Sequence, residues 1–158
     1  MAKAIFAAGC FWGVEATFRA LPGVSSTRVG YTGGNTENPN YKEVCTDRTG
    51  HAEAVEVTYD PVRLSYDKLL EVFWENHDPT QLNRQGPDWG TQYRSAIFFT
   101  SPDQEAAAKA SKEALTKAHR FSKPIVTQIV PAVTFHEAED YHQQYLEKKG
   151  LASCHIKA

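Results

Sequence analysis

The stretch HAEAVEVTYDP, residues 51–61, alternates its side chains and ends at an Asp-Pro turn. This pattern predicts a β-strand from Ala52 to Tyr59, because successive side chains of a strand point to opposite faces. Glu53 then falls on the same face as the apolar residues of the strand, which are Val55, Val57 and Tyr59. Glu56 falls on the opposite face, which we expect to be solvated.

Strands and helices alternate on both sides of this stretch. We predict further strands over Lys3 to Ala8, Val24 to Tyr31, Tyr93 to Thr100 and Ile125 to Val133. We predict helices from Gly13 to Leu21, after the cap Ser65, and from the capping box at Ser101 to about His119. The helix after Ser65 has apolar residues at i, i+3, i+4, i+7 and i+8, which is the spacing of one buried face.

This order of elements predicts an α+β fold. The series β-α-β-β-α-β, followed by one more helix and strand, is that of a two-layer sandwich with a ferredoxin-like split β-α-β core. A chain of 158 residues forms one domain of this kind, so we expect a single catalytic domain over 1–158. The long connections 32–50 and 77–92 are expected to be functional, and 150–158 to be an irregular, mobile tail.

The composition narrows the class of partner. The net charge is −2, and the Lys and Arg residues are scattered, which argues against nucleic acid and anionic lipid. No apolar run is long enough to span a bilayer, and the stretch Ala4 to Trp12 has large aromatics where a signal peptide needs small residues. We therefore expect a cytoplasmic monomer that acts on a small molecule or a protein.

The three cysteines, Cys10, Cys45 and Cys154, are an odd number without a C-x-x-C pair. They predict neither a disulfide framework nor a zinc site. The motif GYTGG, residues 30–34, lacks the spacing of a dinucleotide loop, and His136-Glu137 lacks the second histidine of H-E-x-x-H. We therefore expect no cofactor and no metal ion.

Cys10 stands out by its setting, GCFWG, residues 9–13, between a predicted strand and a predicted helix. A helix N-terminus favours the thiolate, and flanking glycines let a substrate approach the backbone. Phe11 and Trp12 offer apolar walls for a non-polar group. Cys10 could instead be an inert buried side chain with aromatic core neighbours, but the combined setting favours a nucleophile.

Glu53 is an independent signal. Desolvation on the apolar face would raise the pKa of its carboxyl, so that it could hold a proton at neutral pH and act as a general acid. The alternative is that Glu53 reaches solvent or pairs with an arginine at the strand end.

Three further polar residues are candidates. Tyr41 lies one helical turn before Cys45, so the two share a face if this stretch is helical. Asp88 and Tyr93 stand on either side of a loop-to-strand boundary, where polar groups often converge on a site.

Seven motifs together resemble peptide methionine sulfoxide reductase, type A, along essentially the whole chain. They are GCFWG (9–13), GYTGG (30–34), NPNYKEVC (38–45), GHAEAV (50–55), FWENHDPTQ (73–81), GTQYRSAIF (90–98) and EDYHQQYL (139–146). The resemblance implies an enzyme that reduces the S epimer of methionine sulfoxide, free or in proteins, with electrons from thioredoxin.

The resemblance also implies a role for each candidate residue. Cys10 attacks the sulfoxide sulfur, Phe11 and Trp12 surround the S-methyl group, and Glu53 is the acid. Tyr41 and Tyr93 hold the sulfoxide oxygen, and Asp88 is a polar residue on the substrate side. Because the oxygen must be protonated while sulfur is attacked, a neutral carboxyl and two phenols suit this chemistry.

Cys10 is left as a sulfenic acid, which a second thiol must convert to a disulfide. Many relatives have two recycling cysteines in the tail, whereas GLASCHIKA, residues 150–158, has only Cys154. We expect a Cys10–Cys154 disulfide that thioredoxin reduces, and Cys45 stays open as a further exchange partner.

Two other classes of function are compatible with parts of this pattern. A cysteine hydrolase would use Cys10 with His51 or His77 as its base, but it would need neither a protonated Glu53 nor a tail thiol. A methionine-binding module would use the aromatic pocket alone.

Overall fold

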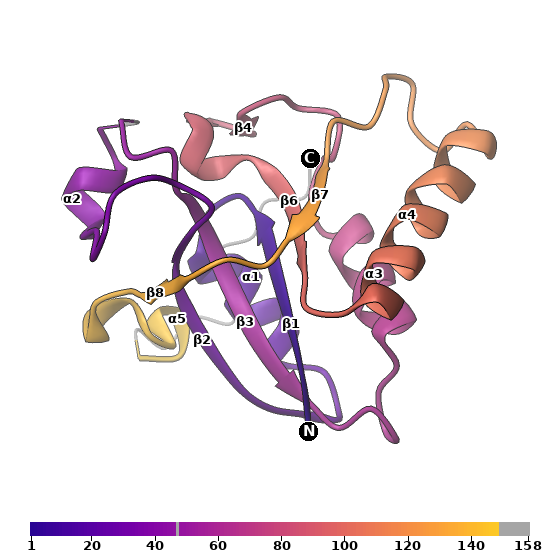
Figure 1. Cartoon of the computed structure of the whole chain (residues 1–158), viewed down its shortest axis with the longest axis horizontal. Coiled ribbons are helices and arrows are strands. Elements are labelled where there is room, and N and C mark those ends of the chain that lie inside the picture. Colours follow the sequence, from indigo (N-terminus) through magenta and orange to yellow (C-terminus); the bar gives the residue numbers. More distant parts are fainter. Residues whose placement is uncertain (47, 149–158) are drawn as a thin grey trace.

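The computed structural model describes residues 1–46 and 48–148 and shows one twisted sheet with helices packed against it (Figure 1). The sheet contains β1 (Ala2–Ala8), β2 (Val24–Thr32), β3 (Ala52–Tyr59), β6 (Ser95–Phe99), β7 (Gln128–Pro131) and β8 (Phe135–Glu137). A separate two-stranded hairpin contains β4 (Arg84–Gln85) and β5 (Asp88–Trp89). The α-helices are α1 (Phe11–Arg19), α2 (Tyr41–Val44), α3 (Tyr66–Glu75), α4 (Pro102–Lys117) and α5 (Tyr145–Lys148). The short 3₁₀ helices are η1 (Thr91–Tyr93) and η2 (Asp140–His142).

The strand order β7-β6-β1-β3-β2-β8 confirms the predicted ferredoxin-like core. Its four inner strands, β6-β1-β3-β2, are antiparallel neighbours. They are the strands of the split β-α-β pattern, with α1 and α3 as its two helices. The last helix and strand extend this core, because β7 joins the edge of β6 in parallel, and β8 pairs with the other edge, at β2.

The main core lies between the sheet and the two helices α1 and α3. The ring of Phe6, from the central strand β1, stacks on Phe18 of α1 at 5.1 Å and on Phe73 of α3 at 5.3 Å. All three side chains are at most 2% exposed. Aromatic burial of this kind is a large favourable term in folding, and it fixes both helices on one face of the sheet.

The opposite face of the sheet corrects the prediction for Glu56. Glu56 is 8% exposed and accepts two hydrogen bonds from the Arg28 guanidinium, at 2.8 and 3.2 Å, so this face of the strand is not solvated. The chain between β7 and β8 crosses this face (Figure 1). Val130 of β7, Phe135 of β8 and Ala132 between the two strands pack on the buried apolar residues of this face. Alternation along β3 identified the two faces, but it could not show that both are covered.

The two predicted helix caps are confirmed, whereas the first helix begins at Phe11, two residues before the predicted Gly13. The Ser65 side chain accepts from the N–H of Lys68 at 3.1 Å, and the Ser101 side chain accepts from Gln104 at 3.2 Å. The strand predicted from Tyr93 begins two residues later, because the N–H of Tyr93 turns back to the carbonyl of Gly90 at 3.0 Å.

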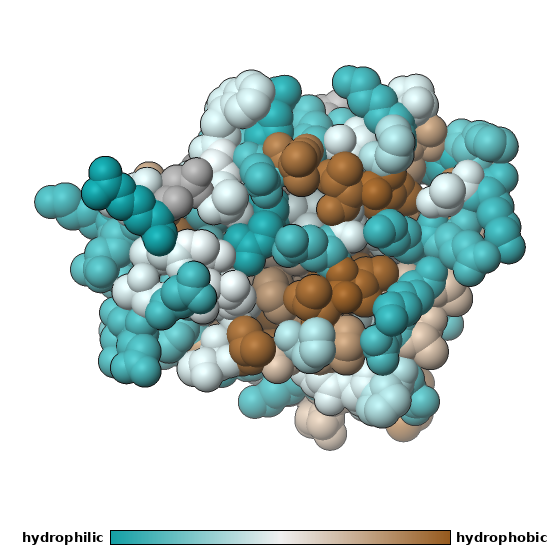
Figure 2. Space-filling model, turned by 45° about the horizontal axis from the view of Figure 1, so that its top comes forward, coloured by the Kyte–Doolittle hydropathy of each residue, from teal (hydrophilic) through white to brown (hydrophobic). Residues whose placement is uncertain are grey.

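Apolar side chains gather near the middle of one face of the molecule, with hydrophilic side chains around and between them (Figure 2). Within the described part of the chain, no helix has both the length and the apolar character needed to cross a membrane.

Candidate active site

Cys10 lies at the turn where β1 ends and α1 begins. Gly9 has φ +98°, a left-handed conformation that favours glycine, and a Cβ there would come within 2.9 Å of the Gln85 side chain in the hairpin. Cys10 is the N-cap of α1 and is half-buried. The thiol therefore lies at the positive end of the helix dipole, as predicted, with the β4–β5 hairpin packed beside it.

Glu53 faces this turn from the neighbouring layer. Its side chain is 1% exposed, and its Oε1 accepts a hydrogen bond from the N–H of Phe11 at 3.2 Å. Its Oε2 is buried and has no hydrogen-bond partner in the described part of the chain. Burial raises the pKa of Glu53 to about 8, against the effect of the Phe11 N–H and with a smaller contribution from the charge of Asp88. The carboxyl is therefore mostly protonated at neutral pH, next to the residue that follows Cys10.

Tyr93 is the last residue of η1. It belongs to the cluster of polar side chains around Cys10 and Glu53. Burial raises the pKa of its hydroxyl, and nearby charges raise it further; they are those of Glu53, Cys45, Asp88 and Cys10. Tyr93 is therefore within electrostatic reach of all four groups. Asp88 is half-buried in β5, and burial also raises its pKa.

Tyr41 is the first residue of α2, so the stretch that contains Cys45 is helical. Burial raises the pKa of Tyr41, followed by its hydrogen bond with Cys45 and then by charges that include those of Tyr93 and Glu53. Partial burial also raises the pKa of the Cys45 thiol, although the residue as a whole is exposed. The structure thus brings Cys45 to the edge of the cluster through Tyr41.

The two aromatic residues after Cys10 have different environments. Phe11 is 1% exposed, and its ring packs 5.7 Å from Tyr31 and 5.2 Å from His142. Trp12 is half-buried and stacks on Tyr145 at 3.9 Å. Trp12 is therefore the more accessible apolar wall, and Phe11 supports it from the core.

His142 and Tyr145 are site neighbours that residue patterns alone did not reveal. The indole N–H of Trp12 donates to Nδ1 of His142 at 3.0 Å, and His142 is 0% exposed. Both residues lie in EDYHQQYL, a motif that contributed to the family resemblance but suggested no contact. The contact with Trp12 could not be predicted from spacing, because this motif lies far along the chain from residues 10–12.

The two histidines that a cysteine hydrolase could use are engaged elsewhere. His51 accepts from the N–H of Gly34 at 3.0 Å and pairs with the carbonyl of Thr36 at 2.6 Å. His77 pairs with the carbonyl of Phe73 at 2.6 Å and with the Ser95 hydroxyl at 2.7 Å. Both ring nitrogens of each histidine are thus occupied, so neither is arranged to take a proton from a thiol.

Cys154 lies outside the described residues. Among residues 1–46 and 48–148, no group of three or more His, Cys, Asp or Glu side chains is arranged to hold a metal ion.

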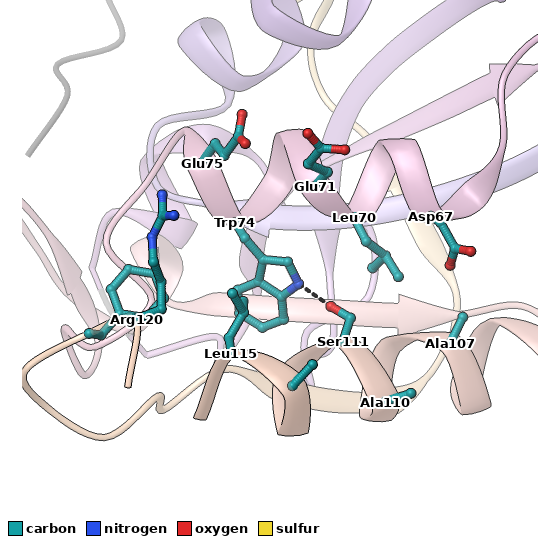
Figure 3. Close-up of a pocket in the computed structure, with 12 residues that line it drawn as sticks. Asp67, Leu70, Glu71, Trp74, Glu75, Ala107, Ala110, Ser111, Leu115 and Arg120 are labelled. Atoms are coloured by element: carbon teal, nitrogen blue, oxygen red, sulfur yellow. Dashed lines mark hydrogen bonds between the residues drawn. The ribbon is translucent and has the colours of Figure 1, made fainter. Parts of the chain in front are cut away.

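A separate groove of about 610 Å³ runs between α3 and α4 (Figure 3). Leu70 and Trp74 lie on its α3 side with three acidic residues, Asp67, Glu71 and Glu75. The indole of Trp74 donates to the Ser111 hydroxyl across it. None of the candidate residues lines this groove, so it is no part of the cluster around Cys10.

A half-buried cysteine beside a protonated carboxyl defines a class of enzyme in which a thiol attacks while an acid donates a proton to the substrate. Comparison with known proteins identifies the family of the chain. Residues 2–158 match the family described as peptide methionine sulfoxide reductase. The peptide methionine sulfoxide reductase MsrA of Acidobacterium capsulatum is 62% identical over 156 residues, which cover 99% of this chain and 100% of the relative.

Solved structures show the same likeness. Methionine sulfoxide reductase A of Corynebacterium diphtheriae has a TM-score of 0.85 at 43% identity, over 96% of this chain and 76% of that one. Reduced Mxr1 of Saccharomyces cerevisiae has a TM-score of 0.88 at 36% identity, over 94% and 86%. Mxr1 in complex with Trx2 has a TM-score of 0.64 at 24% identity, over 91% and 84%, and shows the fold alone.

The chain belongs to the peptide methionine sulfoxide reductase family. It is an oxidoreductase that reduces methionine sulfoxide.

Proposed function

We propose that Cys10 attacks the sulfur of the S epimer of methionine sulfoxide while Glu53 protonates the sulfoxide oxygen. Tyr41 and Tyr93 donate hydrogen bonds to that oxygen, Asp88 contributes polarity on the substrate side, and Phe11 and Trp12 enclose the S-methyl group. The oxygen passes to Cys10 as a sulfenic acid, and methionine leaves as the sulfide. The observation that carries this proposal is the buried Glu53 carboxyl, whose pKa is raised to about 8, beside the turn of Cys10.

The acid is tested by Glu53→Gln, which keeps the shape of the side chain and removes the donated proton. The single-turnover rate of sulfide formation should fall roughly 10²- to 10⁴-fold, while substrate binding changes little. Glu56→Gln is the matched control, because Glu56 lies on the other face of the same strand and pairs with Arg28. A rate in Glu53→Gln equal to that of the control would return Glu53 to a structural role.

We further propose that Cys154 resolves the sulfenic acid. Its thiol displaces the hydroxyl as water, and thioredoxin then reduces the Cys10–Cys154 disulfide to two thiols while its own dithiol is oxidised. Yeast Mxr1, which is 36% identical to this chain in its reduced form, has also been solved in complex with Trx2, and this supports thioredoxin as the reductant. Cys45 is the alternative resolving thiol, since it neighbours Tyr41 at the edge of the cluster.

Cys154→Ser tests the relay. This variant should convert one equivalent of sulfoxide per enzyme, stall with thioredoxin, and recover partly with a small dithiol. Mass spectrometry of the unaltered protein after one turnover should show a Cys10–Cys154 bridge. A Cys10–Cys45 bridge, or normal cycling of Cys154→Ser, would transfer the role to Cys45.

We also propose that residues 1–158 act as one catalytic domain, as a monomer, in the cytoplasm. The absence of a disulfide framework in the sequence supports the cytoplasm. Size-exclusion chromatography with light scattering tests the monomer; a stable dimer at micromolar concentration would contradict it.

A further inference from the structure

The carboxylate of Glu139 joins two parts of the chain that lie far away in sequence. Its Oε1 accepts a hydrogen bond from the Tyr31 hydroxyl at 2.9 Å, and its Oε2 accepts one from the backbone N–H of Tyr41 at 3.0 Å. Tyr31 is a fully buried residue of β2, and Tyr41 begins α2. One side chain thus fastens the start of α2 to the sheet.

The helix α2 depends on such contacts because it has only four residues. Asn40 closes its first turn by accepting from the N–H of Glu43 at 2.8 Å, but this contact lies within the helix itself. Helices of this length have little stability of their own. Val44 anchors the far end in the core, and Glu139 holds the end that carries Tyr41.

The charge of Glu139 matters for this double contact. Burial alone would raise the pKa of its carboxyl, but the N–H of Tyr41, its own backbone N–H, the Tyr31 hydroxyl and the charge of His142 lower it overall. A carboxylate accepts on both oxygens, whereas an amide accepts on only one and presents a donor at the other position. The ionised acid accepts from both tyrosine groups, whereas an amide that accepts from the Tyr41 N–H meets the Tyr31 hydroxyl with a donor and reverses that hydrogen bond.

We propose that Glu139 is a positioning residue for sulfoxide reduction, which holds Tyr41 so that its hydroxyl reaches the oxygen of the substrate at Cys10. The inference rests on the proposed function, in which Tyr41 donates to that oxygen. It also explains two motifs that had no assigned chemistry: Tyr31 of GYTGG is the anchor, and Glu139 of EDYHQQYL is the link.

Glu139→Gln is the first test, and Glu137→Gln is its matched control. Glu137 lies in β8, two residues away, and has a longer, exposed contact with Arg28 at 3.8 Å. Glu139→Gln should lower kcat about 10- to 100-fold with a smaller change in KM, because a donor displaced by roughly 1 Å acts mainly on the transition state. Glu137→Gln should keep the kcat of the unaltered protein.

A double-mutant cycle separates positioning from a merely structural role. Once Tyr41→Phe has removed the hydroxyl, adding Glu139→Gln should lower kcat less than 2-fold, since there is no donor left to misplace. An equal loss of kcat in both backgrounds would overturn the inference. If Glu139→Gln does not fold, Glu139→Asp takes its place in the cycle, because the shorter acid keeps its charge but cannot reach both partners.

The role of Tyr41 and the role of Glu139 are tested separately. If Tyr41→Phe leaves kcat unchanged, the role of Tyr41 in the proposed function is wrong and the inference falls with it. If Tyr41→Phe is slow but Glu139→Gln is as fast as Glu137→Gln, only the inference is wrong.

Discussion

Glu53→Gln should change how the stability of the protein depends on pH, apart from its effect on the rate. The native protein holds the Glu53 proton up to about pH 8, whereas the unfolded chain releases it at the ordinary value of 4.5. The stability that this proton contributes is complete below pH 4.5 and declines as pH rises to about 8. Over this range the unfolded chain ionises freely, whereas the folded protein must keep the carboxyl protonated or ionise it while it is buried. The Gln variant has no such proton and lacks this decline.

The size of the effect follows from the same shift in pKa. At about 1.4 kcal/mol per pKa unit, the free energy of unfolding of the unaltered protein should fall, relative to the Gln variant, by about 3 kcal/mol between about pH 5.5 and about pH 8.5. The side chain is 1% exposed, so solvent does not screen the shift. A difference of this size is a large part of the roughly 5–15 kcal/mol that stabilises a typical domain.

Urea unfolding followed by tryptophan fluorescence at several pH values measures this difference, provided that the two proteins have equal m values. Glu113→Gln is the control, since Glu113 is 65% exposed on α4 and pairs with Lys117. The free energy of unfolding of this control, plotted against pH, should run parallel to that of the unaltered protein. If the Glu53→Gln curve is also parallel, Glu53 is already ionised in the folded state, and its assignment as the acid is refuted.

Three other changes test the surroundings of the thiol. Cys10→Ser should abolish sulfide formation, and iodoacetamide should alkylate Cys10 faster than Cys45, since burial raises the pKa of the Cys45 thiol; faster labelling of Cys45 in peptide mapping would contradict this. Gly9→Ala should lower the free energy of unfolding by about 1–3 kcal/mol, because Gly9 has φ +98° and a Cβ there would meet the Gln85 side chain at 2.9 Å; an unchanged urea midpoint would show that the turn relaxes freely. Trp12→Ala should raise KM for methyl sulfoxides more than for bulkier sulfoxides, which competition assays read directly; equal changes for both would remove Trp12 from the methyl pocket.

Local patterns in the sequence determined the elements and most of the candidate residues. The strand from Ala52 to Tyr59, the caps Ser65 and Ser101, and the placement of Cys10 at a helix N-terminus all follow from spacing within a few residues. The same alternation predicted that Glu53 faces the core. These features depend on backbone periodicity and on local hydrogen bonds, which neighbouring residues fix by themselves.

The tertiary structure decided what each face and each side chain meets. It buried Glu56, and it placed His142 and Tyr145 against Trp12. It also put Glu139 between Tyr31 and Tyr41. These contacts join residues that are about a hundred positions apart, and local patterns carry no information about such pairs. They form only when the whole sheet closes, because burial of apolar surface then compensates for the entropy of bringing distant segments together.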